Sequence, residues 1–195
     1  MKVIGLTGPS GAGKTTVLNL LRDRGATVLD CDLLWYDMVD RNARVRADLE
    51  NAFGQVFLPN GKLDRRTLGS MVFGDAGKLR ELNAIVFYHM GVEVRRRLGV
   101  AASCGLRTFA IDAVNLLESG LGELCDITVA VLAPEEQRIS RIMVRDGIDL
   151  DMAVRRVRAQ KPEEYYRSHA KAVLENTGSR EELLRQAEAL LENYL

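Results

Sequence analysis

The stretch Val3–Thr16, VIGLTGPSGAGKTT, places a glycine-rich segment directly after a short apolar run. Within it, Gly8–Thr15 match the pattern G-x-x-x-x-G-K-[ST], which is typical of a loop that cradles phosphates. Glycines let the backbone curl so that successive N–H groups point at an anion, and a following helix adds about half a positive charge. The stretch therefore predicts a strand, a phosphate-binding loop and a helix, in that order.

The loop pattern assigns a role to each of its polar residues. Lys14 would reach the β- and γ-phosphate oxygens of a nucleoside triphosphate, and the Thr15 hydroxyl would hold Mg²⁺. Thr16, one residue further, would lie near the α-phosphate. The predicted nucleotide-binding residues of this segment are Gly8, Ser10, Gly11, Ala12, Gly13, Lys14, Thr15 and Thr16.

Strand-like and helix-like patterns alternate along the chain, which predicts an α/β fold of three layers, with helices on both faces of a five-stranded parallel sheet. We expect one domain over residues 1–195, with a helical insertion at about 33–100 and a helical lid at about 138–165. Strands are predicted at 3–7, 27–29, 108–111, 127–132 and 172–174. Helices are predicted at 14–24, from about 33 to 53, after Asp64, from Asp75 to Leu98, from Pro134 to Arg145, from Asp149 to about Gln160, and at the C-terminal end.

Carboxylates follow two of the predicted strands. Asp30 and Asp32 flank Cys31 after the second strand, and Asp112 follows the third. In an extended segment residues two apart point to the same side, so one carboxylate could face the γ-phosphate while Asp32 draws a proton from an acceptor hydroxyl. Both acids could instead cap the helix that begins near Leu33. Asp112 has the loose pattern of a second carboxylate beside the metal, although an acid in that place is more often a loop cap.

Three arginines recur along one predicted helical stripe. Arg141 and Arg145 are predicted to clamp the transferred phosphoryl group, because planar guanidinium groups stabilise its developing charge. For Arg138 we expect an ordinary solvated position. His89 and His169 are predicted to be surface or boundary residues without a metal-binding role.

Composition limits the partners that we expect. Lys and Arg number 27 and so do Asp and Glu, which favours a mixed charged surface over a nucleic-acid or acidic-membrane partner. No apolar run approaches the roughly 18 residues of a membrane span. The three cysteines are widely spaced and odd in number, as is typical of a protein of the reducing cytosol. We expect a cytoplasmic protein, monomeric or weakly homo-oligomeric.

Taken together, these motifs resemble the dephospho-CoA kinase family of P-loop kinases over most of the chain. The resemblance is carried by the D-x-D after the second strand and by "GKLDR", "RDG" and "AQ", in that order and spacing. The matching stretches are VIGLTGPSGAGKTTV, GATVLDCD, GKLDRRTLGSMVF, LRELNAIV, IDAVNLLESGLGELCD, EEQRISRIMVRDG, VRAQ and ENTGSREELL.

The resemblance implies ATP- and Mg²⁺-dependent phosphorylation of the ribose 3′-hydroxyl of dephospho-CoA, which yields coenzyme A and ADP. It implies an acceptor-activating role for Asp32, and a place on the acceptor side for the helical insertion. The chain departs from the family at Phe87-Tyr88, where the family commonly has a His-containing pair. Further roles implied by the resemblance are lid arginines Arg141 and Arg145, lid glutamine Gln160, and adenine-side residues Asn176 and Gly178.

Three other functions fit the loop alone. A guanylate-kinase-like enzyme shares "GPSGAGK", but the downstream Ser/Thr-rich element for a guanine base is missing from the sequence. A GTPase switch would need D-x-x-G and N/T-K-x-D patterns, and neither occurs. A nucleotide-binding module without catalysis is disfavoured by the intact Lys14, Thr15 and Asp32.

Overall fold

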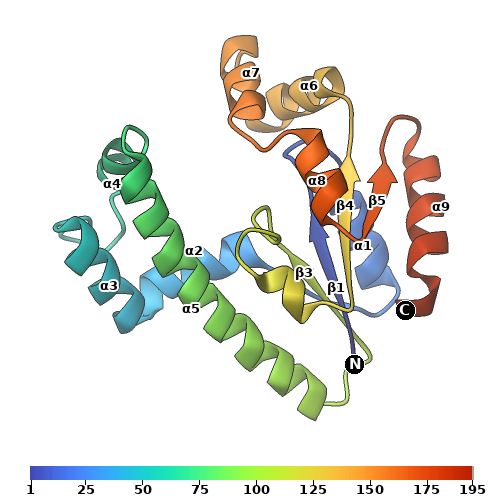
Figure 1. The fold of residues 1–195 in the computed structure, drawn as a ribbon, viewed down its shortest axis with the longest axis horizontal. Coiled ribbons are helices and arrows are strands. Elements are labelled where there is room, and N and C mark those ends of the chain that lie inside the picture. The colour runs from blue at the N-terminus through green and yellow to red at the C-terminus, as the bar shows by residue number, and fades with distance from the viewer. Residues whose placement is uncertain (195) are drawn as a thin grey trace. The chain divides into compact units, whose positions relative to one another are not determined.

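The computed structural model describes residues 1–194 of the 195-residue chain, apart from the side chain of Asn193. The sheet has the strand order β2-β3-β1-β4-β5. β1 pairs in parallel with both β3 and β4, and β4 pairs in parallel with β5 (Figure 1). The predicted α/β fold with five strands is therefore confirmed. The strands are β1 (Lys2–Thr7), β2 (Thr27–Asp30), β3 (Thr108–Asp112), β4 (Ile127–Leu132) and β5 (Ala172–Glu175).

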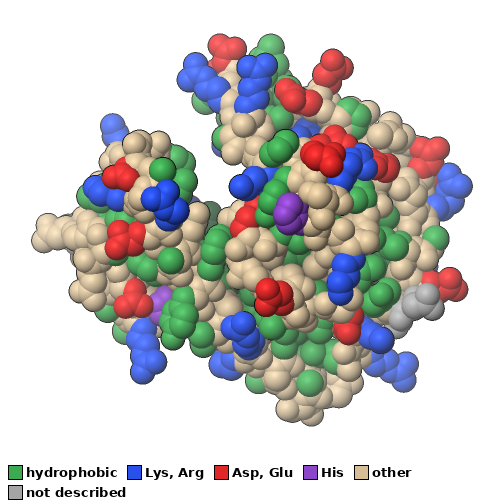
Figure 2. Space-filling view, viewed as in Figure 1, with side chains coloured by type: hydrophobic (Ala, Val, Ile, Leu, Met, Phe, Trp, Pro, Cys, Tyr) green, Lys and Arg blue, Asp and Glu red, His purple; other side chains and the backbone are tan. Residues whose placement is uncertain are grey.

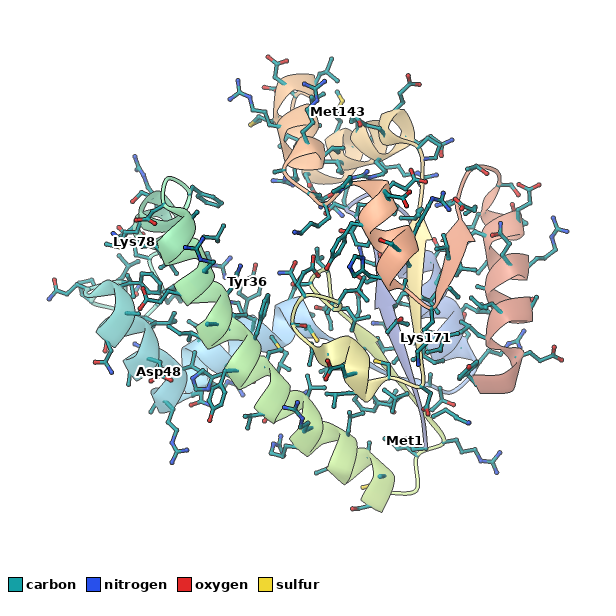
Figure 3. The ribbon with its side chains drawn as sticks, viewed as in Figure 1. Met1, Tyr36, Asp48, Lys78, Met143 and Lys171 are labelled. Carbon is teal, nitrogen blue, oxygen red and sulfur yellow. The ribbon has the colours of Figure 1, made fainter. Side chains whose placement is uncertain are left out.

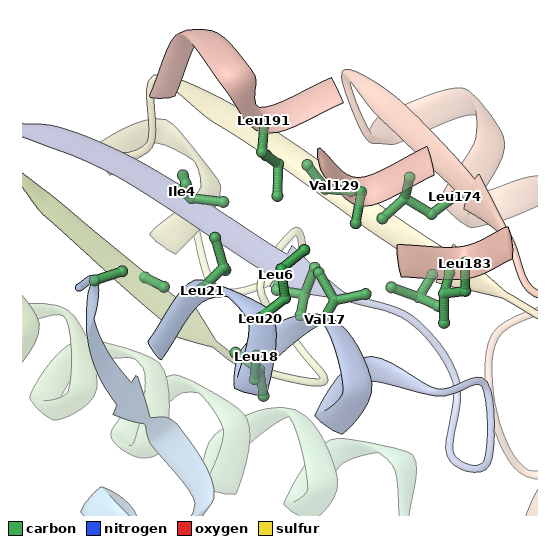
Figure 4. Packing of buried hydrophobic residues seen from close by; sticks show 14 of the residues in the cluster. Ile4, Leu6, Val17, Leu18, Leu20, Leu21, Val129, Leu174, Leu183 and Leu191 are labelled. Carbon is green, nitrogen blue, oxygen red and sulfur yellow. The ribbon is translucent and has the colours of Figure 1, made fainter. Parts of the chain in front are cut away.

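Helices cover both faces of the sheet. The residues of β4 show this, because alternate residues of a strand point to opposite faces. Val129 and Val131 belong to a core with residues of α1 (Lys14–Asp23) and α9 (Arg180–Leu191). Figure 4 shows Val129 beside Leu191 of α9 and Leu174 of β5 in this core. Ala130 and Leu132 pack on the other face against Tyr166 of the short helix α8 (Glu163–His169). The sequence patterns did not reveal α8 or the 3₁₀ turn η1 (Leu121–Leu124), since both are shorter than the periodicity needed to recognise them.

The segment at about 138–165 that the sequence predicts as a helical lid includes most of α6 (Glu135–Asp146) and all of α7 (Leu150–Arg158). Ile142 of α6 is fully buried against Ala153 and Val157 of α7, so the two helices share a small apolar core. Asp149 caps α7, as predicted, by accepting a hydrogen bond of 2.8 Å from the Met152 N–H.

The chain divides into two compact units, residues 1–29 with 98–195, and residues 30–97. The second, helical unit contains α2 (Cys31–Arg41), α3 (Ala43–Phe53), α4 (Arg65–Val72) and most of α5 (Ala76–Ser103). The single helix predicted from about 33 to 53 is wrong. It is interrupted at Asn42, whose extended backbone ends α2 and whose side chain accepts the N–H groups that open α3, the usual behaviour of an N-cap asparagine.

His89 also departs from the prediction of a surface or boundary position. It is buried, and its Nε2 lies 2.7 Å from Asp48 Oδ2, which joins α5 to α3 within the helical unit. On the visible face, Figure 2 shows acidic and basic side chains interspersed, as the equal numbers of the two kinds predict. In the described part of the chain no helix is long and apolar enough to cross a membrane.

Candidate phosphate-binding site

The glycine-rich loop joins the central strand β1 to α1. Its three glycines, Gly8, Gly11 and Gly13, all have positive φ angles, so the loop curls in a way that other residue types rarely adopt. Gly13 is the N-cap of α1, where no described side chain caps the helix and the first turn contains no acidic residue. Backbone N–H groups and the positive end of the helix dipole therefore remain suited to an anion.

Asn176 forms a hydrogen bond to the backbone of this loop. The residue follows β5, is buried, and its Nδ2 donates a 2.7 Å hydrogen bond to the Ala12 carbonyl. Its own N–H donates to Leu132 O of β4, also at 2.7 Å. A Cβ on Gly13 would lie 2.4 Å from Asn176 Nδ2, so this close approach requires glycine. The structure thus places Asn176 against the loop backbone itself.

Lys14 lies over the loop that precedes it. Its Nζ donates to the Gly8 carbonyl at 2.7 Å and to the Pro9 carbonyl at 3.4 Å. Thr15 is exposed in the first turn of α1 and Thr16 is half-buried. The ammonium and the Thr15 hydroxyl thus belong to the loop and the helix start that would bind phosphate, as their positions in the sequence predict.

The lid arginines differ in what they contact. Arg141 donates from NH1 to the Gly11 carbonyl at 3.1 Å, which brings its guanidinium to the loop. Arg138, predicted to be solvated, is instead buried, and its Nε donates to the Ser10 carbonyl at 3.1 Å. The prediction for Arg138 is therefore wrong: the first turn of α6 packs on the loop, so this residue faces inward.

Arg145 pairs with its neighbour on α6. Its Nε and NH2 donate to the two carboxylate oxygens of Asp146 at 2.7 and 2.9 Å, and Arg156 pairs with the same carboxylate. The hydrogen bond from Arg145 holds the pKa of Asp146 below its ordinary value. The side chain of Arg145 is 58% exposed. Its guanidinium bonds to Asp146 of α6, whereas that of Arg141 reaches the loop.

Asp30 ends β2 and Asp32 lies two residues further, but the two do not lie in one extended segment. α2 begins at Cys31, so Asp30 is its N-cap, accepting the Leu33 N–H at 2.9 Å, while Asp32 is exposed in the first turn. The prediction that the two side chains share one side is wrong because the chain turns into a helix between them. Capping, the alternative considered for both acids, is confirmed for Asp30.

Asp112 ends β3, where it pairs in register with Leu6 of β1. The Thr7 hydroxyl at the end of β1 donates to the Val114 carbonyl at 3.0 Å, so the segment after β3 reaches the strand that precedes the phosphate loop. Asp112 therefore lies at the carboxyl edge of the sheet, where ligands of parallel sheets bind.

Tyr36 and Arg65 form a pair within the helical unit that the sequence patterns did not reveal. Tyr36 lies on α2 (Figure 3). The Arg65 guanidinium lies 4.0 Å from the centroid of the Tyr36 ring, within the range of a cation–π contact. Arg65 belongs to the "GKLDR" stretch, and Asp64 caps α4 immediately before it. A guanidinium held in one orientation by an aromatic ring is suited to bind an anionic group.

Gly178 directly precedes Ser179, the N-cap residue of α9. A Cβ there would come 1.8 Å from Glu182 Oε2, because the Glu182 carboxylate folds back to accept the Ser179 N–H at 2.8 Å in a capping box. The absence of a side chain at this residue therefore shapes the turn between β5 and α9, the segment predicted to lie beside the adenine.

The residues present fit a magnesium ion that is held mostly by phosphate. Within residues 1–194 no group of three His, Cys, Asp or Glu side chains could hold a metal ion. Mg²⁺ in kinases is commonly bound through one or two protein oxygens, with phosphates and waters as the other ligands. The exposed Thr15 hydroxyl at the start of α1 meets that requirement.

A parallel sheet whose central strand leads through a glycine-rich loop into a helix, with two arginines of α6 bonded to that loop, is the arrangement of a P-loop kinase. A family model described as dephospho-CoA kinase matches residues 2–182. The chain belongs to the dephospho-CoA kinase family, and it is a kinase.

Curated relatives and solved structures agree with this assignment. A dephospho-CoA kinase of Anaeromyxobacter dehalogenans is 38% identical, over 98% of this chain and 91% of the relative. One of Thermus thermophilus is 40% identical, over 97% and 90%. A crystal structure of a Thermus thermophilus protein superposes with a TM-score of 0.77 at 37% identity, covering 100% of this chain and 98% of the other. A shikimate kinase of Acinetobacter baumannii, at 18% identity and a TM-score of 0.54, shares the fold.

Proposed function

We propose that this chain transfers the γ-phosphoryl group of ATP to the ribose 3′-hydroxyl of dephospho-CoA, giving coenzyme A and ADP. The acceptor oxygen forms a bond to the γ-phosphorus, and the bond from that phosphorus to the β–γ bridging oxygen breaks. The proposal depends above all on the family match over residues 2–182. The curled loop with its helix N-terminus supports the use of a triphosphate.

Within this proposal the loop supplies most of the binding energy for the phosphates. The loop N–H groups and Lys14 would hold the phosphate oxygens, since an array of fixed donors matches their charge without reorganisation. The Thr15 hydroxyl would provide a protein ligand for Mg²⁺, which neutralises developing charge on the phosphates when it is bound. Asn176 would stabilise the loop conformation through its hydrogen bond to the Ala12 carbonyl. The turn at Gly178 would lie beside the adenine.

The chemical step requires a group to receive the proton of the acceptor hydroxyl. We assign this role to Asp32, which is exposed at the start of α2 and occupies the acceptor-activating position of the family's D-x-D motif. Arg141 would stabilise the charge on the transferred phosphoryl group, because its guanidinium already lies at the loop. Arg145 would act in the same way once its guanidinium leaves Asp146, and its exposure allows that exchange.

Anionic groups of the acceptor would bind to the helical unit. Arg65, stacked on Tyr36, is the cation that we assign to the acceptor's phosphates.

We further propose that the protein acts in the reducing cytosol as a monomer or a weak homo-oligomer. The described cysteines, Cys31, Cys104 and Cys125, form no disulfide, which is compatible with that compartment.

An ADP-release assay with ATP and Mg²⁺ tests the proposal. Four parallel reactions contain dephospho-CoA, GMP, shikimate or no acceptor. We expect rapid ADP release with dephospho-CoA alone, and a Lys14→Ala variant should lose that release, which excludes a contaminating kinase. Equal rates with GMP would support the guanylate-kinase-like alternative, and ATP binding with no acceptor-dependent release would indicate a module without catalysis.

A further inference from the structure

Two lid side chains hold every polar group of Ser10, the residue in the middle of the phosphate-binding loop. The Ser10 N–H donates to Gln160 Oε1 at 3.1 Å, and Gln160 Nε2 donates to the Ser10 hydroxyl at 2.8 Å. Arg138 Nε donates to the Ser10 carbonyl at 3.1 Å. Gln160 follows α7 and Arg138 lies in the first turn of α6, so both halves of the lid are attached to one residue of the loop.

Arg138 also fixes the orientation of Gln160. Its NH2 donates to Gln160 Oε1 at 2.7 Å, so that oxygen accepts two hydrogen bonds while the amide nitrogen donates to Ser10. One planar guanidinium thus spans the Ser10 carbonyl and the Gln160 amide with two different nitrogens, a geometry that lysine cannot reproduce. Burial lowers the pKa of the Arg138 guanidinium, but arginine remains protonated in proteins.

Packing reinforces these hydrogen bonds. A Cβ on Gly11 would lie 2.8 Å from the Arg138 carbonyl oxygen and 3.0 Å from its Cα, so the backbone of α6 presses directly on the loop. The same lid segment therefore contacts the loop through its backbone and through the Arg138 side chain. Two neighbouring peptides of the loop, at Ser10 and Gly11, are held in this way.

We infer that Arg138 is a positioning residue, which acts through Ser10 and Gln160 to hold the phosphate-binding loop in its curled shape and to fasten the lid to it. The inference rests on the proposed use of ATP. A loop with three glycines has many alternative conformations, and ordering it upon binding costs conformational entropy. A loop that is ordered beforehand binds its anion more tightly. Arg138 therefore contributes to ATP affinity without touching the reacting atoms.

The test compares Arg138→Ala, Gln160→Ala, the double variant and a control. Titration calorimetry with ATP and Mg²⁺, without acceptor, measures the dissociation constant. We expect each single variant to bind ATP about tenfold more weakly, because Arg138→Ala loses one hydrogen bond to the loop and Gln160→Ala loses two. The double variant should be only slightly weaker than either single variant, because the two side chains act as one unit. Arg158→Ala, an exposed arginine of α7, should bind as the unaltered protein does.

A second measurement separates positioning from general stability. Hydrogen exchange without nucleotide should show faster exchange at residues 9–12 in Arg138→Ala, with unchanged exchange in the sheet. Arg138→Lys should recover less than half of the lost affinity. If Arg138→Ala does not fold, Gln160→Ala and Arg138→Lys carry the same test.

Unchanged affinity in Arg138→Ala and Gln160→Ala would overturn the inference. Tighter binding of ATP by these variants would also overturn the inference. It would mean that Gln160 competes with phosphate for the Ser10 N–H in the unaltered protein. These outcomes differ from failure of the proposed function: ATP affinity is read without turnover, so a chain that binds ATP but does not phosphorylate dephospho-CoA refutes the function alone.

Discussion

Asn176→Asp should destabilise the protein and weaken ATP binding, although it changes the volume of the side chain very little. Asn176 is 6% exposed and its Nδ2 donates to the Ala12 carbonyl at 2.7 Å. Aspartate has a carboxylate oxygen in place of Nδ2, so two acceptors, this oxygen and the Ala12 carbonyl oxygen, would face each other. The carbonyl of Ala12 would lose its partner, and a carboxylate would be buried next to it.

The expected magnitude follows from these two effects. An ordinary hydrogen bond contributes about 1 kcal/mol to the free energy of unfolding, and a buried acceptor left without a partner costs about 1–3 kcal/mol. Asn176→Ala should therefore lose about 2 kcal/mol. Asn176→Asp should lose more at pH 8, about 3 kcal/mol, because a buried carboxylate is also desolvated.

The decrease in the free energy of unfolding caused by Asn176→Asp should be larger at high pH than at low pH. Burial raises the pKa of the new carboxyl above its value in the unfolded chain. The neutral form can donate to the Ala12 carbonyl, so the variant is favoured at low pH and loses stability as pH rises through the folded pKa. The free energy of unfolding of Asn176→Asp should accordingly differ less from that of the unaltered protein at pH 5.5 than at pH 8.

Urea unfolding at both pH values measures these differences, and a matched control isolates the donor. Asn60 is exposed, and its side chain accepts the Lys62 N–H, a role that aspartate fills equally well. Asn60→Asp should therefore change the free energy of unfolding by less than about 0.5 kcal/mol. If Asn176→Asp is as mild as this control at pH 8, the Asn176 hydrogen bond does not hold the loop and the reasoning is wrong.

Three further predictions address the chemistry and the helical unit. Asp32→Asn should abolish phosphoryl transfer while the Kd for ATP, measured by calorimetry, changes less than about twofold; full turnover would refute its role as proton acceptor. Arg141→Ala should lower kcat more than it raises KM for ATP, as steady-state kinetics would show, whereas an effect on KM alone would mean that the contact matters only in the ground state. Hydrogen bonds from Arg96 and then Arg97 hold the pKa of Glu93 at about 2, so this carboxylate stabilises the protein above about pH 4.5 and the effect fades between pH 4.5 and 2. Glu93→Gln should cost at most about 1 kcal/mol at pH 7, and the difference should vanish in acid unfolding near pH 2; an equal loss at both pH values would contradict an ionic origin.

The phosphate-binding end of the fold could be predicted because its determinants are local. The loop pattern of Gly8–Thr15 and the alternation of strands and helices need no knowledge of distant residues. Side-chain positions set by distant contacts could not be predicted. Arg138 and Arg141 share one helical stripe, and only the packing of α6 on a loop some 128 residues earlier buries Arg138.

Two other errors have physical causes of the same kind. The interruption at Asn42 had a local signal, since asparagine is a preferred N-cap, but the apolar periodicity on both sides concealed it. His89 gave no signal, because its partner Asp48 lies on another helix, 41 residues earlier. A single sequence shows which residues bear chemistry more readily than which of them are buried.

The fate of a label on the γ-phosphate of ATP tests the central claim most directly. The chain is incubated with labelled ATP, Mg²⁺ and dephospho-CoA, and the products are separated and identified by phosphorus NMR. The account predicts that the label is recovered in coenzyme A, on the ribose 3′-oxygen, in equal amount to the ADP formed. Label recovered as free phosphate, or on an acceptor other than dephospho-CoA, would contradict it.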